Sequence, residues 1–152
     1  MDLEQLNKTL QHEIPLTEAL AVTLSDYRNN SLTVNAPLAP NINHKQTAFG
    51  GSLYSVAVLA GWALVNLRLS EHDTLLQQRA QVVIYHSEMQ YMKAVHGDFS
   101  AKVTQSAALQ NPRFIQRLLR FGKNSCLESI EILEQNEVKA RLNAKYVVVL
   151  PD

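Results

Sequence analysis

The residue types best suited to chemistry gather in one short stretch, from Asn41 to Ser52, which reads NINHKQTAFGGS. Its glycine pair, Gly50 and Gly51, directly precedes a long apolar segment, so we expect the pair to begin a helix. The first N–H groups of a helix lack partners within it, and glycine lets a carbonyl oxygen approach them closely. These groups can stabilise the negative charge that develops on that oxygen during acyl transfer. The plainer alternative is that the glycines only turn the loop tightly into the helix.

Polar side chains in this stretch suggest further roles. Asn41 and Asn43 can each orient a water molecule or hold an amide of a substrate, although asparagines in such loops also form Asx turns. A histidine can accept a proton near neutral pH, so His44 is either a general base or a solvated loop residue. Ser52 and Ser55 lack the Gly-x-Ser-x-Gly surroundings of a nucleophilic serine. We therefore expect Ser52 to act as a hydroxyl at the start of the helix.

A basic stripe is expected further along the chain. Arg113, Arg117 and Arg120 follow one another at spacings of four and three residues, which places them on one face of a helix. Guanidinium groups bind phosphate groups well, so this face is a candidate phosphate site. An ordinary solvated helix face shows the same pattern.

The composition limits the classes of protein to which the chain can belong. Its 152 residues predict one domain, spanning residues 1–152. Its 14 basic and 14 acidic side chains give a formal net charge of zero, without the basic footprint of a nucleic-acid-binding protein. The single cysteine, Cys126, excludes a disulfide framework and a cysteine-rich zinc site, and we expect no metal ion. Because residues 1–13 are acidic and amphipathic, unlike a secretory signal, we expect a cytoplasmic protein.

The apolar pattern predicts the elements that position these residues. Leu53–Leu69 is interrupted by Ser55, Gly61 and Asn66 and is too short to span a bilayer, so we expect a helix over residues 51–69 buried inside protein. A capped helix before Pro15 precedes it. The expected strands cover residues 20–27, 32–36, 82–92, 99–103, 126–134 and 138–150, with a polar turn over 71–73 and a short helix over 112–121.

Consecutive strands joined by short turns imply an antiparallel sheet, and the single apolar helix must be the element that the sheet wraps. This α+β arrangement is the hot-dog fold, whose open sheet edges favour dimerisation by strand pairing. We expect the strand over residues 82–92 to be central in the sheet. Its side chains that would line an acyl pocket or the core are Tyr85, Met89, Tyr91 and Met92. Glu88, on the opposite face from Met89, would face solvent or supply an acid across a dimer interface.

The motif TAFGGSL over residues 47–53, followed by LAGW over residues 59–62, resembles the thioesterase family named for the YiiD C-terminal domain. The segments Met89–Val95 and Tyr146–Val148 are also similar to that family, which occurs alone or behind an acetyltransferase domain in bacterial proteins. The resemblance implies a hot-dog fold, a homodimer or dimer of dimers, and hydrolysis of acyl thioesters of coenzyme A or of an acyl-carrier protein. Coenzyme A would then be part of the substrate, so we expect no separate cofactor, and neither a nucleic acid nor a membrane as partner.

We therefore expect Asn43, Gly51 and His44 to be catalytic. The residues expected to bind the substrate are Asn41, Thr47, Phe49, Gly50, Ser52, Tyr91, Arg117 and Arg120. The two arginines would hold phosphate groups of coenzyme A.

The chain departs from a more distant group, the phenylacetate-type hot-dog thioesterases, at two points. Phe49 stands where that group has histidine, and residues 58–60, which are Val-Leu-Ala, occupy the region of its helix carboxylate. A non-catalytic module that binds acyl thioesters is therefore an alternative to a hydrolase. A third alternative is an acetyltransferase-associated domain, but the chain lacks the Arg/Gln-x-x-Gly-x-Gly/Ala loop with which an acetyltransferase binds pyrophosphate.

Overall fold

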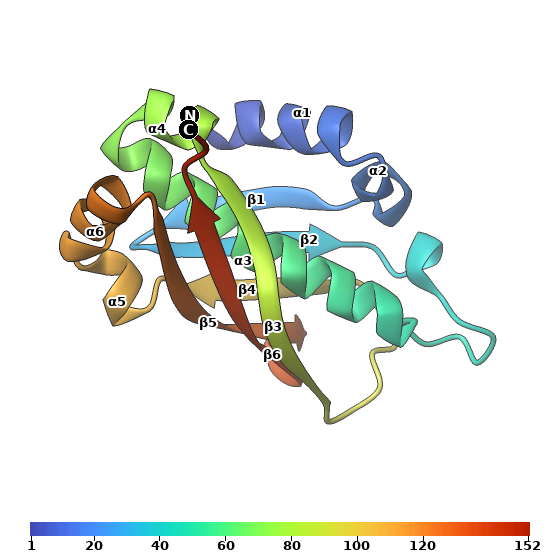
Figure 1. Ribbon diagram of the computed structural model, residues 1–152. Helices are drawn as coiled ribbons and strands as arrows, with labels where there is room; N and C mark the ends of the chain where they lie inside the picture. The colour runs from blue at the N-terminus through green and yellow to red at the C-terminus, as the bar shows by residue number, and fades with distance from the viewer.

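A six-stranded antiparallel sheet curves around one long helix, and short helices cover its margins (Figure 1). The structure is a computed structural model that describes all 152 residues. The helices are α1 (Leu3–Glu13), α2 (Leu16–Leu20), the 3-10 turn η1 (Ala39–Asn41), α3 (Gly50–His72), α4 (Thr74–Arg79), α5 (Ala107–Gln110) and α6 (Arg113–Phe121). The strands are β1 (Thr23–Arg28), β2 (Ser31–Ala36), β3 (Gln81–Tyr91), β4 (Phe99–Thr104), β5 (Lys123–Glu134) and β6 (Glu137–Val149). They lie in the order β1-β2-β4-β5-β6-β3, which confirms the expected α+β hot-dog fold.

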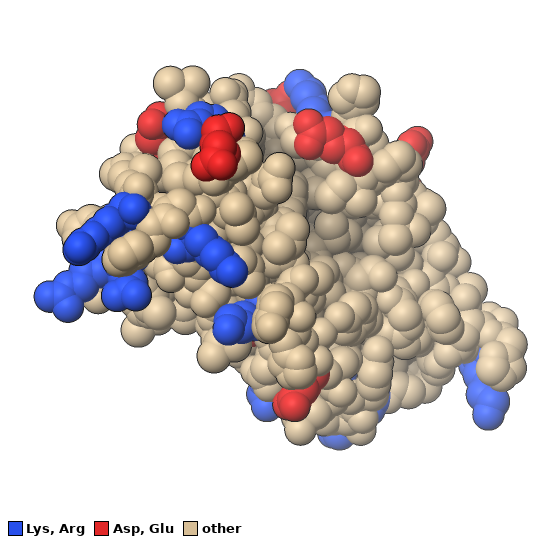
Figure 2. Space-filling model, viewed as in Figure 1, with Lys and Arg blue, Asp and Glu red and all other residues tan.

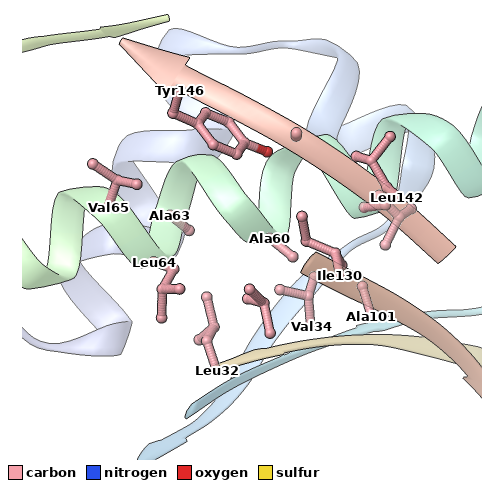
Figure 3. Close-up of a cluster of buried hydrophobic side chains, with 14 of the residues drawn as sticks. Leu32, Val34, Ala60, Ala63, Leu64, Val65, Ala101, Ile130, Leu142 and Tyr146 are labelled. Atoms are coloured by element: carbon pink, nitrogen blue, oxygen red, sulfur yellow. The ribbon is translucent and has the colours of Figure 1, made fainter. Parts of the chain in front are cut away.

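Helix α3 forms the centre of the core, as predicted, and is longer than expected because it runs from Gly50 to His72. Figure 3 shows its side chains interleaved with inward-facing side chains of the sheet. The residues labelled there are all fully buried. Those of α3 are Ala60, Ala63, Leu64 and Val65, and those of the strands are Leu32, Val34, Ala101, Ile130, Leu142 and Tyr146. Burying each large apolar side chain stabilises the fold by roughly 1.5–3 kcal/mol. By length and composition α3 could cross a membrane. However, 72% of its most apolar 18-residue stretch is buried inside the protein, as in the core helix of a soluble protein.

The N-terminal region confirms one expectation and corrects another. Asp2 and Gln5 form the predicted capping box at the start of α1, each side chain bonding to the other's backbone N–H. The strand expected over residues 20–27 begins only at Thr23. Leu20 instead ends the short helix α2, and Ala21 follows in the left-handed conformation, with φ of 55°. Alternating apolar residues cannot distinguish these cases, because a helix end followed by a strand buries the same side chains.

Strand β3 lies at the edge of the sheet, so the prediction of a central position is wrong. It pairs only with β6, and its other edge is open. Tyr85 is 73% exposed and is not part of the core of this subunit. Met89 packs partly against the core, whereas Met92 lies beyond the strand and is 47% exposed.

Short helices account for the other differences from the expected elements. Helix α6 agrees with the prediction: it follows Pro112 and ends at Gly122, whose φ of 71° suits glycine. Helix α5, directly before it, was not predicted. The polar turn expected over residues 71–73 shrinks to Asp73, which ends α3 and whose side chain caps α4 by accepting the N–H of Leu75.

Candidate active site

The loop before α3 is held by the side chain of Asn43. Its Oδ1 atom accepts the backbone N–H groups of Lys45, at 2.8 Å, and of Thr47, at 3.1 Å. Its Nδ2 atom donates to Thr47 Oγ1 at 2.8 Å, and its backbone N–H donates to the Thr47 carbonyl at 2.8 Å. These bonds form an Asx turn, the alternative role expected for Asn43. They leave one Nδ2 hydrogen without a protein partner.

Helix α3 begins without a side-chain cap. The N–H groups of Ser52 and Leu53 both donate to the carbonyl of Phe49, at 2.9 and 3.1 Å, whereas those of Gly50 and Gly51 have no acceptor. The ring of Phe49, which is 58% exposed, lies over Gly51, where a Cβ atom would approach Phe49 Cε1 to 2.5 Å. The central helix therefore starts with two unused donors beside an aromatic ring, an arrangement that can hold an oxyanion.

A cleft of about 230 Å³ opens between this helix start and the segment after β3. Its lining consists of Ala48, Gly50, Leu53, Tyr91, Met92, Lys93, Ala94 and Val95. The Tyr91 hydroxyl donates to the carbonyl of Gly50 at 2.9 Å, and the N–H of Ala48 donates to the carbonyl of Val95 at 2.8 Å. Partial burial, and to a smaller extent the neighbouring Tyr54, raises the pKa of Tyr91, so its hydroxyl is a donor at neutral pH. The structure thus brings the predicted residues Gly50 and Tyr91 together.

Two residues expected to bind the substrate are buried within the subunit. Asn41 is 2% exposed, and its Nδ2 atom donates to the carbonyls of Leu20 and Pro37, at 2.9 and 2.8 Å. Its side chain therefore ties the loop to the end of α2. Ser52 is 8% exposed, which agrees with a role at the helix start and leaves little surface for a substrate.

Neither a carboxylate nor a histidine lines the cleft. His44 is exposed in the loop, outside the cleft lining. Glu88 is exposed on β3, and because Ser87 and Tyr91 contact α3, the pleat of the strand turns Glu88 to the opposite face. The cleft lining therefore supplies neither a carboxylate nor an imidazole to accept a proton.

The arginines of α6 lie far from the start of α3. Helix α5, which precedes them, is bonded to the other end of α3, where Arg68 Nε donates to the Leu109 carbonyl at 3.0 Å. The guanidinium groups of Arg117 and Arg120 lie 5.7 and 5.1 Å from the centre of the Phe121 ring. Within one subunit the structure does not bring these arginines to Gly50 (Figure 1).

Sequence reasoning missed a hydroxyl pair that joins α3 to β3. The hydroxyls of Tyr54 and Ser87 lie 2.6 Å apart, one helical turn after the glycine pair. The alternation of β3 places Ser87 on the same face as Tyr91, which is the one signal that could have found it. Nothing in the sequence shows that this face of β3 crosses the start of α3.

Comparisons with known proteins agree with the fold. The family described as "Putative thioesterase (yiiD_Cterm)" matches residues 3–150. A "putative thioesterase" from Shewanella oneidensis is 27% identical, with 98% of this chain and 97% of that chain covered and a TM-score of 0.85. A protein of unknown function from Chlorobaculum tepidum is 26% identical, with coverage of 97% and 94% and a TM-score of 0.87. A thioesterase from Haemophilus influenzae, 17% identical with coverage of 99% and 92% and a TM-score of 0.75, shares the fold.

The family match covers nearly the whole chain, including the loop, the glycine pair and the cleft. The structures from Shewanella oneidensis and Chlorobaculum tepidum share the fold over almost their full length. The chain therefore belongs to the YiiD C-terminal thioesterase family.

Proposed function

We propose that this protein hydrolyses acyl thioesters at the N-terminus of α3. The observation that carries the proposal is the pair of unused N–H groups on Gly50 and Gly51, beside the cleft that Gly50 helps to line. Removing one such donor commonly lowers kcat by about 100-fold or more, so two donors can supply a large part of the rate enhancement. Family membership supports a thioester as the substrate. We further propose that the thiol is coenzyme A or an acyl-carrier protein.

In the proposed reaction, water adds to the carbonyl carbon of the thioester. The carbonyl oxygen becomes negative in the tetrahedral intermediate, and the N–H groups of Gly50 and Gly51 stabilise that charge. The carbon–sulfur bond then breaks, which yields a carboxylic acid and a thiol, and the proton lost by the water ends on the sulfur. Asn43 retains one Nδ2 hydrogen with which to orient the water, and His44, on the same loop, is the candidate to carry the proton.

We also propose that two copies of the chain form a dimer in the cytoplasm through β3. Strand β3 pairs only with β6, its other edge is open, and Ile84 on this strand is 38% exposed. A long apolar edge strand promotes aggregation unless it is paired, and a two-fold axis pairs the strand with its own copy in the antiparallel direction. Such a partner would lie beside the end of β3 that carries Tyr91, where it can supply the acid or base that the cleft lacks. Two dimers could associate further into a tetramer.

A second candidate function is binding of an acyl thioester without turnover. The cleft favours it in one respect, because its lining contains no carboxylate and no histidine. The two functions share the same ligand and the same helix start, and they differ only in whether the thiol is released.

A thiol-release assay with short, long and aromatic acyl-CoA substrates tests the proposal, and Gly50 offers a matched pair of variants. Proline lacks an N–H and is well tolerated at the first position of a helix. The preceding Phe49, with φ of −62° and ψ of 131°, already has the conformation that a following proline requires. A Cβ atom at position 50 would meet the Tyr91 ring at 3.5 Å, an ordinary contact. Gly50→Pro therefore removes one donor, whereas Gly50→Ala retains it.

We expect turnover of at least one substrate by the unmodified protein and a kcat about 100-fold lower in Gly50→Pro, with Gly50→Ala within about threefold. Circular dichroism and the melting temperature verify that both variants are folded. Equal turnover of the two variants would contradict the role of the helix N–H groups. Absence of turnover on every substrate, together with stabilisation of the protein by acyl-CoA, would establish the binding module instead.

A further inference from the structure

A basic groove runs over the outer face of the sheet, away from α3. We define it as the two adjoining cavities lined by Arg113, Arg117, Lys123, Lys145 and Tyr85. Their volumes are about 220 and 340 Å³, and they share Asn124 and Ser125, so they form one continuous depression from α6 to β3. Figure 2 shows Lys and Arg gathered over α6 and the adjoining strands on this face of the molecule.

The positive charge of the basic groove is not neutralised by the protein. Neither cavity is lined by an aspartate or glutamate. The basic residues that do form ion pairs all lie outside the groove: Lys8, Arg28, Lys93, Lys139 and Arg141. Because the whole chain has a formal net charge of zero, this concentration of unpaired cations does not follow from its composition. Such a depression attracts an anion with more than one negative charge.

An exposed aromatic ring forms one wall of the basic groove. Tyr85 is 73% exposed, and Lys145 Nζ lies 5.3 Å from the centre of its ring. An aromatic ring offers a stacking surface for any nucleobase, because every base has a π face. A planar base against Tyr85 and phosphate groups along the cationic wall would occupy the depression together, whereas a simple inorganic anion would use only the cations.

We propose that the basic groove binds a nucleoside that carries two or more phosphate groups. The base lies against Tyr85, and Arg113, Arg117, Lys123 and Lys145 neutralise the phosphates. The nucleotide half of coenzyme A has this chemistry, and its assignment as the natural ligand rests on the proposed function. The groove is on the opposite face of the sheet from α3, so its binding properties can be measured separately from hydrolysis.

Calorimetric titration of the full chain with adenosine 3′,5′-bisphosphate, and separately with inorganic diphosphate, tests the inference. We expect Arg117→Gln and Lys145→Gln each to weaken bisphosphate binding by about tenfold, since a hydrogen bond to a charged group commonly contributes that much affinity. Tyr85→Ala should weaken bisphosphate binding by about tenfold as well and leave diphosphate binding unchanged. Lys102→Gln, which removes an exposed lysine of β4 outside the groove, is the matched control and should bind within about twofold of the unmodified protein.

Absence of bisphosphate binding, or equal binding by all the variants, would overturn the inference. Binding of diphosphate as tightly as the nucleotide, without an effect of Tyr85→Ala, would overturn the nucleoside part of it. Competition between the bisphosphate and acyl-CoA in the hydrolysis assay would identify coenzyme A as the source, and binding without competition would identify another nucleotide. Hydrolysis without nucleotide binding would overturn this inference alone, whereas nucleotide binding without hydrolysis would support it and contradict the proposed function.

Discussion

The ring of Tyr146 occupies the space that any side chain at position 61 would need. A Cβ atom on Gly61 would lie 2.1 Å from the Tyr146 hydroxyl oxygen and 2.5 Å from its Cζ atom. Tyr146 is fully buried, and its hydroxyl donates to the carbonyl of Val58 at 2.8 Å. The glycine within α3 therefore allows β6 to insert a tyrosine against the helix backbone, and this contact fixes how the sheet wraps α3 (Figure 3).

We expect Gly61→Ala to lower the free energy of unfolding by about 3 kcal/mol, which is the upper range for overpacking a core. For a chain of this length the melting temperature should fall by about 10 °C. The sign of the change in the free energy of unfolding is informative, because alanine in place of glycine stabilises a helix by about 1 kcal/mol where space allows. Thermal unfolding followed by circular dichroism measures the change.

Gly97→Ala is the control for this substitution. A Cβ atom there would meet only the flexible end of the Glu134 side chain, at 3.1 Å, so we expect a change in melting temperature of less than about 3 °C. A Gly61→Ala protein as stable as the unmodified one would show that β6 does not pack on α3 in this way.

The buried carboxyl group of Glu128 predicts a pH-dependent stability. Burial raises its pKa, while hydrogen bonds from the Ser106 N–H and hydroxyl, at 2.9 and 2.7 Å, and from the Cys126 thiol partly oppose that shift. The folded state therefore holds the proton more tightly than the unfolded state. Glu128 stabilises the fold below the ordinary carboxyl pKa, about 4.3, and this contribution is lost as the pH rises through the raised pKa.

We therefore expect the stability of Glu128→Gln, relative to the unmodified protein, to increase as the pH rises from about 4.3 and then to reach a plateau. Chemical unfolding at a series of pH values measures this difference. Glu88→Gln, which removes an exposed carboxylate, is the control for the change in net charge. A constant difference for Glu128→Gln across the pH series would show that Glu128 does not hold its proton more tightly in the folded state.

The open edge of β3 predicts that the protein is at least a dimer, with a mass in light scattering of twice the 17.1 kDa of one chain or more. Ile84, on that strand, does not belong to the core cluster, so Ile84→Asp should leave the subunit folded and place like charges across the paired strands. We expect this variant to be monomeric at micromolar concentration. Leu127→Asp, at a site on β5 that is 68% exposed and away from the edge, should remain dimeric. A stable monomer of the unmodified protein would contradict pairing through β3.

The sequence predicts the helix and strands that are buried by their own chain. The spacing of apolar residues is compatible only with a helix in α3 and only with a strand in β6, and the structure confirms both elements. The place of β3 in the sheet could not be predicted, because a long apolar strand has the same pattern in the centre of a sheet and at an edge covered by another molecule. Helix α2 is only five residues long, and its burial pattern merges with that of β1.

The sequence predicts which loop and which helix start form the candidate site, but not the contacts that their side chains make. The glycine pair lies where expected because an apolar helix must begin after it. The partners of Asn41 and Asn43 could not be predicted, since a carbonyl such as that of Leu20 is brought near by the fold rather than by the local sequence. For the same reason the sequence could not show that α6, which carries Arg117, packs against β5 rather than beside Gly50.

The hydrogen bonds of Asn43 predict how substitutions at this residue affect turnover. Asn43→Asp keeps the oxygen that accepts the N–H groups of Lys45 and Thr47, whereas Asn43→Ala loses both of these bonds. Asp has no amide hydrogen to orient the water, so we expect Asn43→Asp to lose about tenfold in turnover with unchanged hydrogen exchange. Asn43→Ala should lose at least as much turnover and also show faster hydrogen exchange in residues 43–48. His44→Ala, which removes the candidate proton carrier from the same loop, should lower turnover by about 100-fold and leave hydrogen exchange unchanged. Full turnover in Asn43→Asp, with a loss confined to Asn43→Ala, would show instead that Asn43 acts only by shaping the loop.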